Sequence, residues 1–126
     1  MEEKKYLRLN DIEAYRISFS LSNFVWAIVN DWKNLEKDTI GKQFIRAVDS
    51  ASANIAEGFG RYNKKDKIKF YRYSFGSVYE ALDWNEKAWI RCLLKPEQYE
   101  HVFQELQKLP KAINSLVKYT QNHLSI

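Results

Sequence analysis

Apolar residues recur every three or four positions along most of the chain, which is the spacing of one face of an α-helix. The first such stripe consists of Ile17, Leu21, Phe24, Ile28, Trp32 and Leu35. Three further stripes begin at Phe44, Tyr71 and Tyr99. No segment alternates with the two-residue period of a half-buried strand. The pattern therefore predicts four helices, over about 10–37, 39–59, 63–93 and 96–122.

Helix-capping residues predict the first two connections. Residues 36–41 are expected to form the first turn, with Asp38 or Thr39 as N-cap, because their side-chain oxygens can accept hydrogen bonds from the free amides of a first helical turn. Gly58 or Gly60 is expected to end the second helix, since glycine readily adopts the left-handed conformation of a helix C-terminus. Both connections are predicted to be short.

The later connections carry similar signals. Asn63, followed three residues later by Asp66, is typical of a helix N-terminus. Pro96 suits a first helical position, whereas Pro110 lies inside the last helix and predicts a kink or a short break. Four amphipathic helices with short connections fold most simply as an up-down-up-down antiparallel bundle. The predicted fold class is all-α, with a single four-helix bundle domain over 1–126.

The first and third helices carry a second set of residues on the side opposite the core stripe. These are Tyr15, Phe19, Ser22 and Trp26 on the first helix, and Tyr73, Ser77, Glu80 and Trp84 on the third. Both sets are spaced four, three and four, and contiguous exposed aromatic residues favour association. The spacing predicts a homo-oligomer interface, with scattered surface aromatics as the alternative.

Small and polar residues lie beside the core stripe of the second helix. They include Ala47, Ser50, Asn54, Glu57 and Gly58. Small residues let another helix approach closely, and Asn54 and Glu57 are expected to form hydrogen bonds across that contact. A general acid or base role for the carboxylate is the less favoured alternative, because it needs a second titratable group and a cleft. The expected role is packing.

Composition places the chain among soluble globular proteins. It has 126 residues, of which 45% are hydrophobic and 29% charged. No apolar run approaches the roughly 20 residues that span a bilayer, so no membrane partner is expected. Residues 1–13 lack the apolar core of a signal peptide, and the single cysteine, Cys92, cannot form an internal disulfide. These features lead us to expect a cytoplasmic protein. We expect Cys92 to be a small packing residue, with a reactive thiol as the less favoured alternative.

Positive charge is concentrated at the turn between the second and third helices. Residues 61–72 hold six cations and one acid, a net charge of +5 in a chain whose total is +4. The cations are Arg61, Lys64, Lys65, Lys67, Lys69 and Arg72, and the interleaved aromatics are Phe59, Tyr62, Phe70, Tyr71 and Tyr73. Clustered cations neutralise phosphates, and aromatic rings stack on unpaired bases. The segment predicts a nucleic-acid-binding site, with lysines that merely solvate helix ends as the alternative.

Patterns typical of enzymes are not found in the sequence. Neither His101 nor His123 has a glutamate three residues before it, as the ligands of a di-iron bundle would require. The sequence has no glycine-rich phosphate loop, no His-Glu-x-x-His motif and no Gly-x-Ser-x-Gly elbow. We therefore expect a non-enzymatic protein with no metal site, catalytic residue or cofactor.

One segment resembles a known family. The matching residues are Arg46-Ala47-Val48, Ser50, Asn54-Ile55-Ala56-Glu57-Gly58, Gly60-Arg61, Gly76-Ser77 and Glu80. In these residues the chain resembles the bacterial 23S rRNA intervening-sequence proteins, also called the S23 ribosomal protein family.

The resemblance implies a cytoplasmic up-down bundle that assembles into a ring, as a homopentamer. It implies that the matching polar and glycine residues pack and form hydrogen bonds between helices or subunits; these are Asn54, Glu57, Gly58, Ser77 and Glu80. A related branch is the accessory variability determinant of diversity-generating retroelements. Similarity to that branch implies two partners, a nucleic acid, either RNA or DNA, and a reverse transcriptase.

Overall fold

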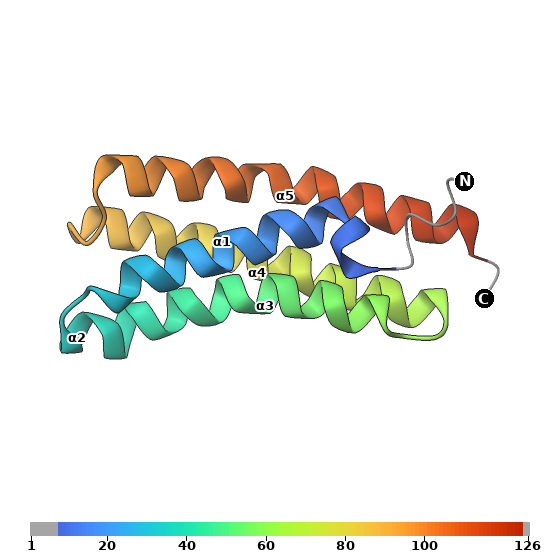
Figure 1. Ribbon diagram of the computed structural model, residues 1–126, viewed down its shortest axis with the longest axis horizontal. Coiled ribbons are helices and arrows are strands. Elements are labelled where there is room, and N and C mark those ends of the chain that lie inside the picture. The colour runs from blue at the N-terminus through green and yellow to red at the C-terminus, as the bar shows by residue number, and fades with distance from the viewer. Residues whose placement is uncertain (1–7, 125–126) are drawn as a thin grey trace.

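The computed structural model describes residues 8–124, in which four long helices lie side by side (Figure 1). Their bounds are Glu13–Asn30 for α1, Lys42–Phe59 for α3, Lys64–Ile90 for α4 and Pro96–His123 for α5. A short 3-10 turn, η2, covers Leu9–Asp11. The helix α2 (Asn34–Glu36) and the π-helical turn η3 (Lys37–Gly41) lead directly into α3. No strand is found within 8–124.

Successive long helices run in opposite directions along the bundle (Figure 1). α3 packs against α1 and α4, and α5 packs against the same two helices. Around the bundle the order is therefore α1, α3, α4, α5, so that α3 lies between α1 and α4. The predicted all-α, up-down-up-down four-helix bundle is confirmed. None of the helices in 8–124 is long and apolar enough to cross a membrane.

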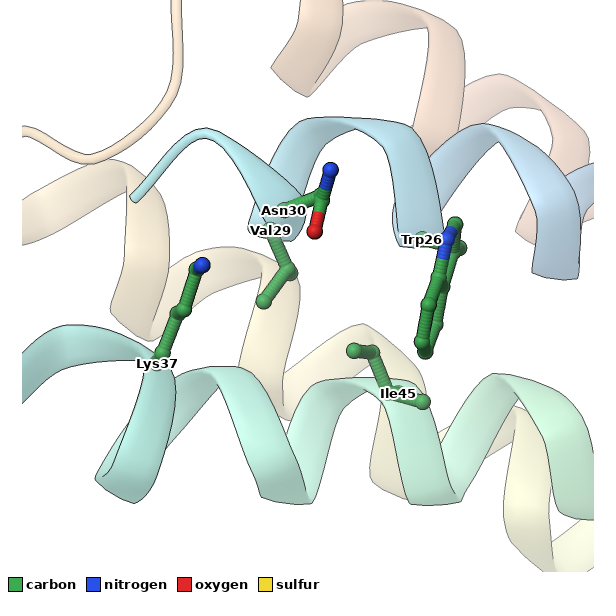
Figure 2. A pocket seen from close by; sticks show the side chains of 5 residues that line it. All are labelled: Trp26, Val29, Asn30, Lys37 and Ile45. Atoms are coloured by element: carbon green, nitrogen blue, oxygen red, sulfur yellow. The ribbon is translucent and has the colours of Figure 1, made fainter. Parts of the chain in front are cut away.

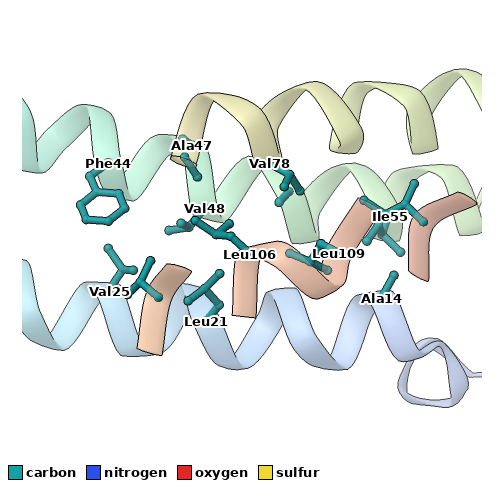
Figure 3. Close-up of a cluster of buried hydrophobic side chains, with 14 of the residues drawn as sticks. Ala14, Leu21, Val25, Phe44, Ala47, Val48, Ile55, Val78, Leu106 and Leu109 are labelled. Carbon is teal, nitrogen blue, oxygen red and sulfur yellow. The ribbon is translucent and has the colours of Figure 1, made fainter. Parts of the chain in front are cut away.

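The core contains apolar side chains from all four long helices (Figure 3). Fully buried members include Leu21, Val25, Phe44, Val48, Ile55, Val78, Leu106 and Leu109. Each large apolar side chain removed from water contributes roughly 1.5–3 kcal/mol, which is the main source of the bundle's stability.

The first turn lies earlier in the chain than the sequence predicted. α1 ends at Asn30, and Lys33 is the extended N-cap residue (φ −75°, ψ 164°) of the next helix. The predicted helix over 10–37 and the predicted turn over 36–41 are therefore wrong. Residues 37–41 instead form the π-helical turn inside a continuous helical run. Leu35, predicted for the core, is 71% exposed.

The predicted ends of the other helices have mixed outcomes. Asn63 caps α4 as predicted, because its Oδ1 accepts a hydrogen bond from the Asp66 amide at 2.8 Å. Gly60 ends α3 in a right-handed conformation (φ −80°), and no glycine in 8–124 has a positive φ, so the left-handed glycine was wrongly predicted. α5 continues through Pro110, where a break had been one of the two expectations. It spans 96–123, close to the predicted 96–122.

Cys92 lies just beyond the C-terminus of α4, which ends at Ile90 and not near 93. Cys92 itself is the one non-glycine residue in 8–124 with a positive φ (63°). Its side chain is exposed, so the predicted packing role is wrong. The expectation about an N-terminal signal falls largely on residues 1–7, which lie outside the described residues.

Candidate nucleic-acid interface

The turn that carries most of the positive charge is fixed at both ends by hydrogen bonds. Asn63 caps the first turn of α4, and the amides of Gly60 and Arg61 donate to Ala56 O and Gly58 O at 3.1 Å each. Residues 60–63 therefore form a short, defined connection between α3 and α4. This connection presents Tyr62, whose side chain is 80% exposed.

Two of the six predicted cations bind backbone carbonyls at helix ends. Lys67 Nζ donates to Phe59 O at 2.7 Å, and burial lowers the pKa of the Lys67 ammonium. Lys64 Nζ donates to Gln121 O at 3.2 Å and to Leu124 O at 3.1 Å. Carbonyls in the last turn of a helix lack intrahelical partners and carry partial negative charge, so a cation there is stabilising. Lys64 and Lys67 thus connect α4 to the ends of α5 and α3.

A third cation, Arg61, is engaged in an ion pair and a ring contact. Its guanidinium lies 2.7 Å from Glu57 and 4.5 Å from the centroid of the Phe70 ring. Lys69 Nζ lies 5.5 Å from the same ring, and Tyr73 packs edge-on against it with centroids 5.4 Å apart. The half-buried Phe70 ring is therefore covered by two cations and a tyrosine.

The remaining cations lie on one outward side of α4. Lys65, Lys69 and Arg72 are exposed, and their spacing of four and three places them in a row about 10 Å long. No carboxylate within 8–124 forms an ion pair with any of the three. The predicted six-residue patch thus divides into three cations held by carbonyls or an ion pair, and an outward row of three exposed cations, of which Lys69 also contacts the Phe70 ring.

The two aromatic sets predicted for an oligomer interface border the same side of the bundle. Ser22 Oγ of α1 donates to Asp49 Oδ1, and Ser77 Oγ of α4 donates to Ser50 Oγ at 2.9 Å. Asp49 and Ser50 are neighbours in α3, so the two sets flank the outer side of that helix. We call this surface the α3 face; its residues are Tyr15, Phe19, Ser22, Trp26, Ser50, Tyr73, Ser77, Glu80 and Trp84.

Members of the α3 face differ in how far they are exposed. Phe19, Trp26 and Tyr73 are each more than half exposed, at 51%, 58% and 52%. Tyr15 and Trp84 are half-buried and pack against the core, so the prediction that the sets lie wholly opposite the core was wrong for these two. The reason is that both rings are large enough to reach the core from the edge of their helix.

A pocket of about 200 Å³ opens on the α3 face (Figure 2). Trp26 of α1 and Ile45 of α3 extend toward each other from the two helices that border it, and Val29, Asn30 and Lys37 complete the lining. The lining is mostly apolar, with the Lys37 ammonium as its charged group. Sequence reasoning missed this pocket, because it depends on how α1 and α3 pack.

The predicted packing residues of α3 act within their own helix. Asn54 Nδ2 donates to Ser50 O at 2.9 Å and to Ser50 Oγ at 3.0 Å, and the exposed Glu57 pairs with Arg61. The prediction that Asn54 and Glu57 form hydrogen bonds across to another helix of the same bundle was therefore wrong. Gly58, in contrast, is buried at the contact with α4.

Besides the Lys67–Phe59 bond, two hydrogen bonds between α3 and α4 come from serines. The buried Ser74 donates through Oγ to Ala51 O at 2.6 Å, and the Ser77–Ser50 bond lies nearby. Ser74 falls at the same helical spacing as the buried Tyr71 and Val78. Glu80 accepts from Trp84 Nε1 at 3.4 Å, within α4. Among residues 8–124, no group of three or more His, Cys, Asp or Glu side chains is placed to hold a metal ion.

Comparisons with known proteins give consistent results. The family model for the 23S rRNA-intervening sequence protein matches residues 10–115. A crystal structure from Bacteroides thetaiotaomicron, of a protein with unknown function from the S23 ribosomal protein family, has a similar fold, with a TM-score of 0.74 and 19% identity. The similarity covers 83% of this chain and 98% of that one. No curated protein matches the chain.

Proposed function

This chain belongs to the family of 23S rRNA-intervening sequence proteins, and on that premise we propose that it is a non-enzymatic, oligomeric bundle that binds RNA or DNA. The observation that carries the proposal is the outward row formed by Lys65, Lys69 and Arg72. None of these three cations forms an ion pair with a carboxylate among residues 8–124, so their charges are available to the phosphates of a nucleic acid. Each phosphate contact releases condensed counterions and favours binding.

The arrangement of the other cations supports this assignment. Lys64 and Lys67 account for the stability of the turn, which leaves the outward row without a comparable structural role. A lysine in the first turn of a helix interacts unfavourably with the helix dipole. Lys64 offsets this by binding carbonyls at the end of α5, whereas Lys65 has no such partner. A stability cost of this kind is expected where the charge serves binding.

The α3 face supports the oligomeric part of the proposal. Phe19 and Trp26 are both more than half exposed, and Trp26 also lines an apolar pocket. Burial of such apolar surface favours association. An oligomer repeats the basic segment of residues 61–72, which we call the basic turn, in each copy and so multiplies the avidity for a long polyanion. The pentamer and a reverse-transcriptase partner stay predictions that follow from the resemblance, as does the bacterial cytoplasm as its location.

A second candidate is a purely structural or protein-interaction module. The same exposed face favours it, because an apolar surface can serve assembly with no nucleic acid present. In that case the outward row would serve solubility alone. The two candidates differ in whether the cations change binding to a polyanion.

The test compares wild-type protein with the triple variant Lys65→Gln, Lys69→Gln, Arg72→Gln. Binding to a labelled structured RNA and to a matched DNA is measured by fluorescence anisotropy across a salt series. Loss of three phosphate contacts is expected to reduce the slope of log K against log salt by about 2 to 3. The matched control replaces three exposed lysines elsewhere by Gln, at Lys95, Lys111 and Lys118, and removes the same charge.

The control separates local contacts from net charge. An equal loss of nucleic-acid affinity in both triple variants would show that only the total charge matters and would contradict the assigned site. Absence of binding by wild-type protein at low salt would favour the protein-interaction module.

A further inference from the structure

The basic turn exposes one aromatic ring that no other side chain covers. Among the five aromatics interleaved with the cations, Tyr71 is buried, Phe59 is half-buried with Lys67 Nζ 5.5 Å from its centroid, and Phe70 is covered by Arg61. Tyr73 packs against Phe70 and lies on the α3 face. Tyr62 is left, 80% exposed and with no ring contact inside the described chain.

Tyr62 lies in the connection that leads directly into the part of α4 with the outward row of cations. It precedes the cap residue Asn63, and Lys65 follows three residues later in the first turn of α4. Because the Asn63 cap fixes the backbone here, the position of Tyr62 relative to this turn is constrained. A stacking ring beside a line of cations is the combination found where proteins bind single-stranded nucleic acid.

We infer that Tyr62 with Lys65, Lys69 and Arg72 forms a site for unpaired nucleotides, in which the ring stacks on one base and the cations contact neighbouring phosphates. The inference rests on the proposed function and narrows its ligand. A continuous duplex presents base faces only at its ends, so the Tyr62 ring has no base to stack on along a duplex. Only the cations would then contribute to duplex affinity. Unpaired bases in loops, bulges and tails present both faces.

The consequence is a preference for single strands that depends on one ring. Stacking on an aromatic side chain changes affinity by about tenfold or more, and it tolerates any base because every base has a π-face. The cations supply affinity for any polyanion, whereas Tyr62 supplies the discrimination. Replacement of Tyr62 should therefore affect single-strand binding alone.

The experiment uses full-length protein and two probes, a labelled oligoadenylate RNA and the same strand annealed to oligouridylate. At one fixed salt concentration, wild type is expected to bind the single strand more tightly than the duplex. Tyr62→Leu is expected to weaken single-strand binding about tenfold and to leave duplex binding unchanged, while Tyr62→Phe retains the ring and the affinity. Tyr79→Leu is the matched control, since Tyr79 is 52% exposed on α4 but lies outside the basic turn.

The outcomes separate this inference from the proposed function. If Tyr62→Leu binds the single strand as tightly as wild type while the triple cation variant does not, the stacking site is wrong and phosphate binding stands. Equal wild-type affinity for single strand and duplex also overturns the stacking site. If wild type binds neither probe at low salt, the proposed function fails as well. Circular dichroism of each variant checks that the helices are retained.

Discussion

The ring of Tyr71 in α4 lies directly against the backbone of Gly58 in α3. A Cβ atom on residue 58 would be 2.7 Å from Tyr71 Cε1 and 2.9 Å from the Lys67 carbonyl oxygen. Real Cβ atoms do not approach that closely, so only glycine allows the two helices to meet here. On α3 the contact lies in the last helical turn, two residues before the connection of residues 60–63, and it sets how α3 and α4 converge on that connection.

We expect Gly58→Ala to destabilise the bundle by about 1–3 kcal/mol, the usual cost of overpacking a core. The loss should appear although alanine is the better helix former. The matched control is Gly76→Ala, because a Cβ there meets no atom within 4 Å. That variant should gain roughly 0.5–1 kcal/mol. Urea denaturation of both variants gives the comparison, and a similar effect of the two substitutions would refute the close contact.

Lys67 and Lys65 are expected to have opposite roles although only one residue separates them. Lys67→Met removes the hydrogen bond to Phe59 O and should cost about 1 kcal/mol of unfolding free energy. Lys65→Met changes an exposed side chain and should stay within about 0.5 kcal/mol of wild type. For RNA binding we expect the opposite: Lys65→Met should lower the affinity more than Lys67→Met, since Lys65 belongs to the outward row. Denaturation and anisotropy on the same two variants test both halves of the prediction.

Ionisation of the Tyr71 hydroxyl is expected to make the free energy of unfolding depend on pH in the alkaline range. Burial raises the pKa of the Tyr71 hydroxyl from 10.0 to about 12. The unfolded chain loses this proton near pH 10 whereas the folded protein keeps it, so the folded state binds more protons between pH 10 and 12. The free energy of unfolding therefore falls as pH rises through that window.

The Tyr71→Phe variant isolates this contribution. Below pH 10 it should have nearly the stability of wild type, because no hydrogen bond of the hydroxyl is lost. Towards pH 12 wild type should lose about 2 kcal/mol more than the variant. Lys67 titrates in both proteins, so its lowered pKa cancels in the difference. Parallel loss of stability in the two proteins at alkaline pH would contradict the assignment.

Local sequence signals predicted most of the fold because the helices are amphipathic and capped. Asn63 and Pro96 start their helices as predicted, since capping depends on the nearest few residues. The first turn was misplaced because Trp32 and Leu35 continue the apolar period beyond it. Trp32 is held by a distant contact, in which its indole Nε1 donates to Leu93 O at 3.1 Å. A contact between residues so far apart in the sequence cannot be recognised from the local spacing of apolar residues.

The candidate site was likewise predicted only in part from the sequence. Charge and aromatic content were evident from the sequence, which located the basic turn. The separate roles of Lys64 and Lys65 were not, because they depend on the C-terminus of α5 coming close to the N-terminus of α4. Only Lys64 reaches the carbonyls of Gln121 and Leu124. Neighbouring lysines of equal charge thus differ through tertiary structure alone.

Trp26 is the best single position to test assembly through the α3 face. It is 58% exposed and lines the apolar pocket. Trp84 is a poorer probe, because it packs against the core and a charge there would also destabilise the fold. Trp26→Asp places a carboxylate where an oligomer would exclude water, which opposes burial strongly.

We therefore expect Trp26→Asp to lower the mass measured by light scattering while the helical circular dichroism persists. Ile90→Asp is the matched control, since Ile90 is 75% exposed at the far end of α4 from the basic turn. That variant should keep the wild-type mass. If Trp26→Asp keeps it too, this end of the α3 face is no subunit contact. The smaller assembly should also bind a long RNA less tightly than wild type, because fewer basic turns then act on one strand.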